Sequence, residues 1–149
     1  MVEVLSNRDL YLFTGGDPPN LADLEALYMA QVAGPSVGEE VWHNWIIRPN
    51  HTGGAVGFVQ ATVTSDSADV AWVVGVEWQG QGFASEAASA MCEWLAAQGV
   101  ENVTAHIHPG HVASQRVAAS LGMQATDEID EDGEVVWASV PRSAGRTAD

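Results

Sequence analysis

The chain contains no lysine, and its only permanently cationic side chains are five arginines. Twenty aspartate and glutamate residues oppose them and give a formal net charge of −15. A domain with this charge repels phosphate backbones, so the composition argues against a nucleic-acid partner. Its field instead favours a cationic partner such as an amine, although acidity that serves only solubility explains the same composition.

Cysteine is also scarce, because Cys92 is the only one, and no disulfide can form within the chain. This usage is typical of a reducing interior, so we expect a cytoplasmic protein in which Cys92 is a small packing residue. No run of 18 apolar residues and no basic-then-apolar leader occurs in the sequence. We therefore expect neither a membrane span nor a secretory signal.

The length predicts a single domain. With 149 residues, 15.7 kDa and 46% hydrophobic residues, the chain has enough apolar side chains for one core. No internal repeat or linker divides it. We expect one domain over residues 1–149, with a variable N-terminal part at 1–40 and a loose tail at 141–149.

Apolar spacing and turn residues predict ten elements in the order β-α-β-β-β-α-β-α-β-β, which indicates a mixed α/β (α+β) fold. The expected helices lie between Asn20 and Gly34 and over residues 83–98 and 111–121. The expected strands cover residues 10–13, 41–48, 55–64, 69–76, 102–108, 123–129 and 134–140. Trp42 and Trp45 lie three apart on one of them, so they should face opposite sides of the sheet.

A Q-x-x-G-x-A loop, Gln79 to Ala84, follows an apolar strand and leads directly into an alanine-rich helix. Gly80 and Gly82 can adopt positive φ and let a ligand approach the backbone. The first N–H groups of the helix lie at the positive end of its dipole, so the loop is suited to a pyrophosphate. It is neither the dinucleotide fingerprint nor the P-loop.

With this loop, two further features make the chain resemble the GNAT superfamily of N-acetyltransferases, and within it the branch of ribosomal-protein alanine acetyltransferases. One is a segment that runs from His111 through Ser114 and Arg116 to Gly122, and the other is the acidic hairpin at the end. The resemblance covers about residues 40–140. It implies a mostly antiparallel central sheet flanked by helices, with Gly75 marking a bulge in the strand before the loop.

The resemblance implies acetyl-CoA as co-substrate, with no metal. The residues expected to bind it are Trp72, Val73, Val74, Gly80, Gln81, Gly82, Phe83, Ala84, Ser85, His111, Ser114 and Arg116. His111 stands where relatives commonly have Asn, so its contact to the cofactor differs from theirs. Helix capping is an alternative role for both His111 and Ser114.

The implied chemistry is direct attack of a primary amine on the thioester. The amine must lose a proton to a carboxylate or a histidine, and Asp69, His106, His108 and Glu77 are the groups that could accept it. Spacing singles out none of them, and Asp69 and His108 are the two that we predict as catalytic candidates. Many relatives use a Tyr as general acid; Ala118 stands at its place, and Ser114 is predicted to act on the sulfur instead. The acceptor is a small-molecule amine, a protein N-terminus or a lysine.

Two other functions fit parts of the sequence. A GNAT-like domain without the Tyr could bind acyl-CoA as a sensor or partner-binding module and transfer nothing. The H-x-H-x-x-H array of His106, His108 and His111 has the spacing of zinc ligands in metal-dependent hydrolases, although Gly110 replaces the Asp of that motif. Exposed sheet edges are also compatible with a homodimer.

Overall fold

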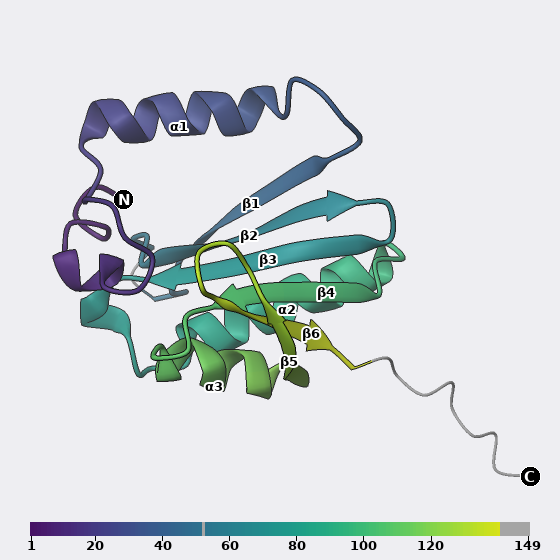
Figure 1. The fold of residues 1–149 in the computed structure, drawn as a ribbon. Helices are drawn as coiled ribbons and strands as arrows, with labels where there is room; N and C mark the ends of the chain where they lie inside the picture. Colours follow the sequence, from purple (N-terminus) through teal and green to yellow (C-terminus); the bar gives the residue numbers. More distant parts are fainter. Residues whose placement is uncertain (52, 141–149) are drawn as a thin grey trace, which may run out of the picture.

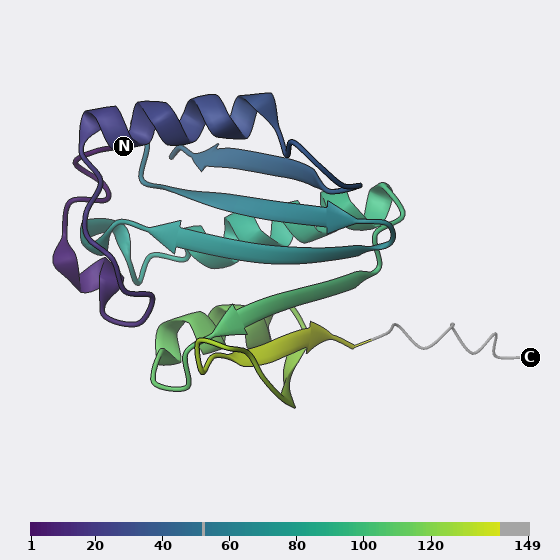
Figure 2. The ribbon, with the colours of Figure 1, turned by 45° about the horizontal axis from the view of Figure 1, so that its top comes forward.

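The computed structural model describes residues 1–51 and 53–140, so the tail predicted at 141–149 lies outside the described part. Its elements are η1 (Arg8–Tyr11), α1 (Leu21–Ala33), β1 (Val41–Ile47), β2 (Gly57–Thr64), β3 (Ser67–Val74), η2 (Val76–Trp78), α2 (Phe83–Ala97), β4 (Asn102–Ile107), α3 (Val112–Ser120), β5 (Met123–Ile129) and β6 (Val135–Ser139). They form one six-stranded sheet in the order β1-β2-β3-β4-β6-β5. Figures 1 and 2 show α2 and α3 on one face and α1 beside the other.

Strand pairing confirms the predicted fold class. Every neighbouring pair is antiparallel except β3 and β4, which are parallel and are joined by α2. The core lies between the sheet and α2 with α3, where Leu95, Met91 and Ala118 pack against inward residues of β2, β3 and β4. None of the described helices has the length and apolar character needed to cross a membrane.

The first predicted strand, at residues 10–13, is wrong. Leu10 and Tyr11 belong to the 3-10 helix η1, and the two residues after them form a turn. The helix starts after Asn7, whose side chain accepts the Asp9 N–H at 2.9 Å. The Tyr11 hydroxyl donates to the Leu5 carbonyl at 2.9 Å, and Leu10 packs against a small cluster that includes Leu24. These local contacts override the strand preference of the apolar and aromatic run, which has no neighbouring strand to pair with.

Helix α1 begins where the sequence predicts. Asn20 and Asp23 form a reciprocal capping box at 2.8 and 3.1 Å, and Gly34 ends the helix with φ of 77°. Of its apolar side chains only Leu24 is buried, however, and Val32 is 89% exposed. The helix therefore contacts the sheet through one end, and most of its length covers little of the sheet face.

The two tryptophans of β1 lie on opposite faces, as predicted. Trp45 packs against the main core and makes an edge contact with Trp94 of α2, with ring centroids 5.3 Å apart. Trp42 lies on the α1 side, where its ring N–H donates to the Glu40 carboxylate at 3.3 Å. The contact of Trp45 with Trp94 is thus part of the packing between β1 and α2.

Candidate active site

A cleft of about 1040 Å³ opens where β3 and β4 part. The two strands pair over only three positions, Ser67 to Asp69 against Asn102 to Thr104. Beyond Asp69, β3 continues beside β2 as far as Val74, and its other edge faces the cleft. Trp72, Val73 and Val74 are therefore a stretch of strand with one free edge.

The glycine loop forms one end of this cleft. Gly80 and Gly82 have φ of 75° and 86°, and a Cβ on either would point into open space. The first intrahelical bond of α2 joins the Glu86 N–H to the Gly82 carbonyl at 3.0 Å, so the three preceding N–H groups lie ahead of the helical ladder. The side chain of Gln79 donates to the Val74 carbonyl at 3.0 Å and ties the loop to the end of β3.

The cleft brings together nearly all of the predicted cofactor residues. Those that line it are Trp72, Val73, Val74, Gly80, Gly82, Phe83, Ala84, Ser85, His111, Ser114 and Arg116. Gln81 does not line it and instead makes a long contact of 3.5 Å to the Glu77 carbonyl. Among the described residues that line the cleft, Arg116 is the only permanently cationic side chain, so the backbone N–H groups are the main donors for an anion.

The bulge predicted at Gly75 is wrong. The register of β2 with β3 runs without a shift to the pair of Gly57 with Val74, and Gly75 follows the strand, where its N–H donates to the Val56 carbonyl at 2.8 Å. A Cβ on Gly75 would lie 2.7 Å from the Trp78 ring. Glycine is required here by close packing, and the pairing of β3 with β4 already ends at Asp69, ahead of this glycine.

His111 and Ser114 lie side by side at the start of α3. His111 occupies the cap position, yet its side chain makes no capping bond. Its ring stacks on Phe13 with centroids 4.6 Å apart, and its Nε2 lies 3.5 Å from the Ser114 hydroxyl. Burial and the nearby His108 lower the pKa of His111, which keeps the imidazole neutral at neutral pH. Ala118, at the place of the family Tyr, is fully buried in the core.

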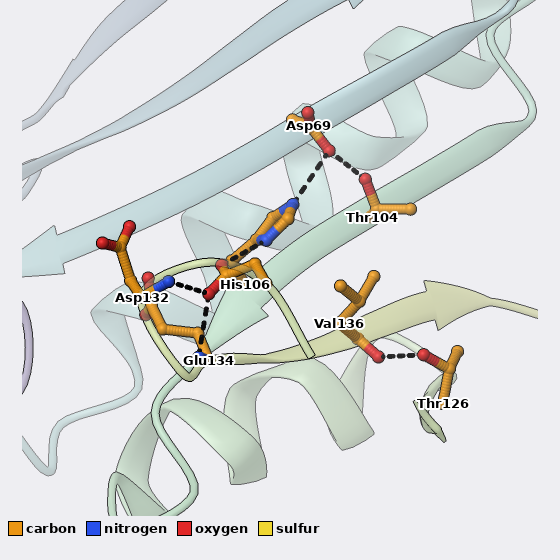
Figure 3. A network of polar contacts seen from close by, with 8 residues as sticks. Asp69, Thr104, His106, Thr126, Asp132, Glu134 and Val136 are labelled. Atoms are coloured by element: carbon orange, nitrogen blue, oxygen red, sulfur yellow. Dashed lines mark hydrogen bonds and ion pairs between the residues drawn. The ribbon is translucent and has the colours of Figure 1, made fainter. Parts of the chain in front are cut away.

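Asp69, one predicted base, lies outside the cleft lining. Its carboxylate accepts from the Thr104 hydroxyl and lies 3.6 Å from His106 Nε2 (Figure 3). The other nitrogen of His106 contacts Asp130 at 2.8 Å. Partial burial would lower the pKa of His106, but the hydrogen bond with Asp130 and the surrounding carboxylates outweigh it and raise the pKa.

His108, the other predicted base, lines the cleft. Its Nδ1 accepts the N–H of Gly110 at 2.9 Å, and its ring leans on Phe13 with centroids 5.1 Å apart. With Nδ1 occupied as an acceptor, a neutral His108 carries its proton on Nε2. Glu77, a further candidate, does not line the cleft.

The sequence did not single out Glu134, which lines the cleft beside His106 and His108. One oxygen of Asp130 accepts the N–H groups of Asp132 and Glu134, both at 2.9 Å, and so fixes the turn that carries Glu134 (Figure 3). Burial, together with the negative charge of Asp130, raises the pKa of Glu134. The acidic turn was visible in the sequence, but only the folded sheet brings Glu134 to the same cleft as Ser114.

The three histidines do not form the ligand set that their spacing suggests. His106 contacts carboxylates, His108 contacts a backbone amide and His111 contacts Phe13 and Ser114. In residues 1–51 and 53–140, the group of side chains whose ligand atoms converge is Asp130, Asp132 and Glu134, within 4.8 Å of one another. The arrangement therefore gives no support to the zinc hydrolase alternative.

Comparison with known proteins agrees with this geometry. The profile of the acetyltransferase (GNAT) domain matches residues 1–124, which extends the likeness into the N-terminal part. A search of curated proteins finds no significant match.

Solved structures share the fold. The aminoglycoside acetyltransferase AAC(6')-Ib, in complex with paromomycin and acetyl-CoA, is 21% identical with a TM-score of 0.76, and the alignment covers 99% of this chain and 90% of that one. A GNAT-family acetyltransferase from Bacillus anthracis is 18% identical with a TM-score of 0.72 over 93% and 85%. A Vibrio cholerae protein named as a ribosomal-protein-serine acetyltransferase is 17% identical with a TM-score of 0.68 over 82% and 76%. These identities show the fold alone. Because the family profile spans most of the sequence, the chain belongs to the GNAT acetyltransferase family.

Proposed function

We propose that this protein transfers the acetyl group of acetyl-CoA to a primary amine by direct attack within a ternary complex. The observation that carries the proposal is the free edge of β3 at Trp72 to Val74, which leads into the glycine loop and the first N–H groups of α2. An extended amide-containing arm can pair with such an edge, and a pyrophosphate can accept from such a helix end. Acetyl-CoA as the donor is further supported by the family and by its presence in the AAC(6')-Ib complex.

For the base we favour Glu134 over the two groups that the sequence suggested. Asp69 is occupied by Thr104 and His106 and is 61% exposed. His108 in its neutral form has its proton on Nε2 and its other nitrogen in use. Glu134 faces the cleft, and its raised pKa strengthens it as a proton acceptor from an ammonium group.

Ser114 is the group proposed to act on the leaving sulfur. Ser114 belongs to α3 and lines the same cleft as Glu134. The reaction forms a bond from nitrogen to the acetyl carbon and breaks the bond from that carbon to sulfur. Glu134 takes the proton that nitrogen loses, and the Ser114 hydroxyl donates a hydrogen bond to the sulfur that receives the electron pair.

A cationic small-molecule amine is the acceptor class that the charges favour. Asp9, Asp17 and Glu134 line the cleft against a single arginine, Arg116. AAC(6')-Ib has been solved with aminoglycosides, which supports a small amine for this fold. A protein N-terminus or a lysine side chain presents the same nucleophile and belongs in the same screen.

Calorimetric titration with acetyl-CoA, followed by a screen for CoA release with amines, tests the proposal. Micromolar binding and turnover with at least one amine are expected, and Ser114→Ala should lower kcat more than it weakens cofactor binding. Ser120→Ala is the matched control, because Ser120 lies on the same helix and its hydroxyl donates to the Val117 carbonyl at 2.6 Å. Binding without turnover across all amines would favour the sensor alternative, and no binding by a folded sample would refute the cofactor site.

A further inference from the structure

The imidazole of His111 has little support from its own helix, which contacts the ring through the Ser114 hydroxyl at the long distance of 3.5 Å from Nε2. His111 is the residue before α3, and its backbone is outside helical geometry with ψ of 74°. Its N–H donates to the His108 carbonyl at 2.9 Å, but its ring makes no capping bond. A histidine ring in this place can rotate about its side-chain bonds unless something outside the helix holds it.

Phe13 supplies that support from the N-terminal part of the chain. Its ring is nearly parallel to that of His111, with an interplanar angle of 12° at a centroid distance of 4.6 Å. The same ring also touches His108, and a Cβ on Gly110 would lie 3.2 Å from it, so the three sit tightly against one another. Phe13 therefore fills the space over the turn from β4 to α3.

The segment that carries Phe13 is itself well anchored. Asn7 caps η1, the Tyr11 hydroxyl bonds the Leu5 carbonyl, and the Gly15 N–H bonds the Tyr11 carbonyl at 2.9 Å. Leu10 packs with the cluster formed by Val4, Leu5 and Leu24. A residue held in this way can fix the orientation of a ring that lies against it.

Ser114 differs from the other serine of α3 in where its hydroxyl is directed. Ser120 donates to a carbonyl of its own helix, which is the common behaviour of a helical serine. In the described residues, the hydrogen-bond contact of the Ser114 side chain is with His111 Nε2, at the long distance of 3.5 Å. When Nε2 carries the proton, it donates to the Ser114 oxygen, and the hydroxyl proton is free to point into the cleft.

We propose that Phe13 and His111 are positioning residues for Ser114. The stacked Phe13 ring holds the His111 imidazole with its Nε2–H directed at the Ser114 oxygen, and this contact aims the Ser114 hydroxyl proton at the leaving sulfur. The inference rests on the proposed acetyl transfer for its catalytic meaning, while the positioning itself is a property of the free protein. It also gives a physical role to the histidine that stands in place of the family Asn.

Two measurements test the positioning, and the first needs no substrate. In the free protein, NMR titration of His111 should show a pKa below the ordinary histidine value, because the ring is buried by Phe13 and lies near His108. Among the described residues, the ionisable or polar groups beside it are His108 from the turn that follows β4 and Ser114 from α3. Phe13→Ala should expose the ring and raise this pKa towards 6.5, whereas Phe13→Tyr should leave it unchanged. An unchanged pKa in a folded Phe13→Ala protein would overturn the stacking role.

The second measurement is a double-mutant cycle in kcat. Phe13→Ala should lower kcat by about tenfold with little change in the KM for acetyl-CoA, since misorientation affects the chemical step. The same change in the Ser114→Ala background should have almost no further effect, because the oriented group is already absent. Equal losses in both backgrounds would show that Phe13 acts independently of Ser114 and would overturn the proposal.

Controls separate this inference from failure of the fold or of the proposed function. Phe13→Leu retains apolar volume without the ring; it should keep the thermal stability and reproduce the loss in kcat if stacking is what matters. Should no amine support turnover, the acetyl-transfer proposal fails, but the His111 titration still shows whether Phe13 positions the imidazole. If the pKa of His111 responds to Phe13→Ala as expected but no amine is turned over, the proposed function is the part that fails. If an amine is turned over but the pKa of His111 does not respond to Phe13→Ala, this inference is the part that fails.

Discussion

Strand β3 has two neighbours and pairs with them very differently. With β2 it keeps an unbroken antiparallel register from Ser67 to Val74, while with β4 it pairs only over Ser67 to Asp69. The backbone N–H and C=O groups on the β2 side of β3 are therefore paired along the whole strand. On the β4 side, the N–H and C=O groups beyond Asp69 face a cleft and are available to a ligand.

The comparison teaches that the cleft forms because the pairing of β3 with β4 ends after Asp69. The lining side chains of β3 are apolar, and in the described part of the chain Arg116 is the only permanently cationic side chain that lines the cleft. Binding of a long, anionic, amide-containing molecule must then depend on backbone groups of β3 and of the glycine loop. Changes to backbone geometry on the two sides of β3 should accordingly have larger effects than most changes to side-chain charge.

The largest effect is expected at the glycine loop. Gly82→Asp should abolish detectable acetyl-CoA binding in a calorimetric titration, because φ of 86° strains a side chain and the carboxylate repels phosphate. Gly99→Asp is the matched control, since Gly99 follows the other end of α2 with φ of 87°. If both variants fold and bind acetyl-CoA equally well, the loop does not hold the pyrophosphate.

The next largest effect is expected at Glu134, which lines the same cleft as the free edge of β3. Glu134→Gln should lower kcat by about 100-fold at neutral pH, because the amide cannot accept a proton. Since the pKa of Glu134 is raised, the wild-type rate should increase as pH rises through that raised value, and this limb should vanish in the variant. Glu131→Gln changes the same turn at a residue outside the cleft lining and should retain the rate. A similar loss in both variants would indicate damage to the hairpin alone.

A smaller effect is expected on the paired side of β3. A Cβ on Gly57 would overlap the Val73 carbonyl oxygen, so Gly57→Ala must push the end of β3 away from β2. We expect a loss of about 2 kcal/mol in the free energy of unfolding, measured in urea, and weaker acetyl-CoA binding. Gly54→Ala, with nothing within 4 Å of its Cβ, should change stability by less than about 0.5 kcal/mol. Unchanged stability in Gly57→Ala would mean that the close approach of β2 and β3 relaxes without cost.

The smallest effect concerns His106, which joins β3 to the hairpin through Asp69 and Asp130. Its pKa in the folded protein is raised, so the stabilisation is complete below the ordinary value of 6.5 and is lost as pH rises through the raised value. The contribution is roughly 0.5 kcal/mol because solvent screens partly exposed pairs. In His106→Gln, the unfolding free energy should depend less on pH over the range in which His106 titrates. A slope identical to that of the wild type would show that the contacts store no such energy.

Much of the fold could be predicted from local patterns. The capping residues Asn20 and Asp23, the stop at Gly34 and the glycine loop at Gly80 and Gly82 act over a few residues, so their spacing carries the information. Residues 10–13 could not be assigned in this way, because a 3-10 helix and a strand differ there only in what packs around them. The exposure of α1 could not be predicted from the sequence either, because the spacing of its apolar residues does not show how closely the helix packs on the sheet.

The sequence by itself determined the order of the helices and strands after residue 20, the positive-φ glycines and the shortage of cations, because each is a property of one residue or its near neighbours. Only the tertiary structure decided which ionisable groups meet. Glu134 enters the cleft because β6 pairs with β4, and His111 is held at Ser114 because the N-terminal segment folds back over the start of α3. Such contacts join residues far apart in the chain, and their geometry is fixed by strand pairing and packing, which no local spacing encodes.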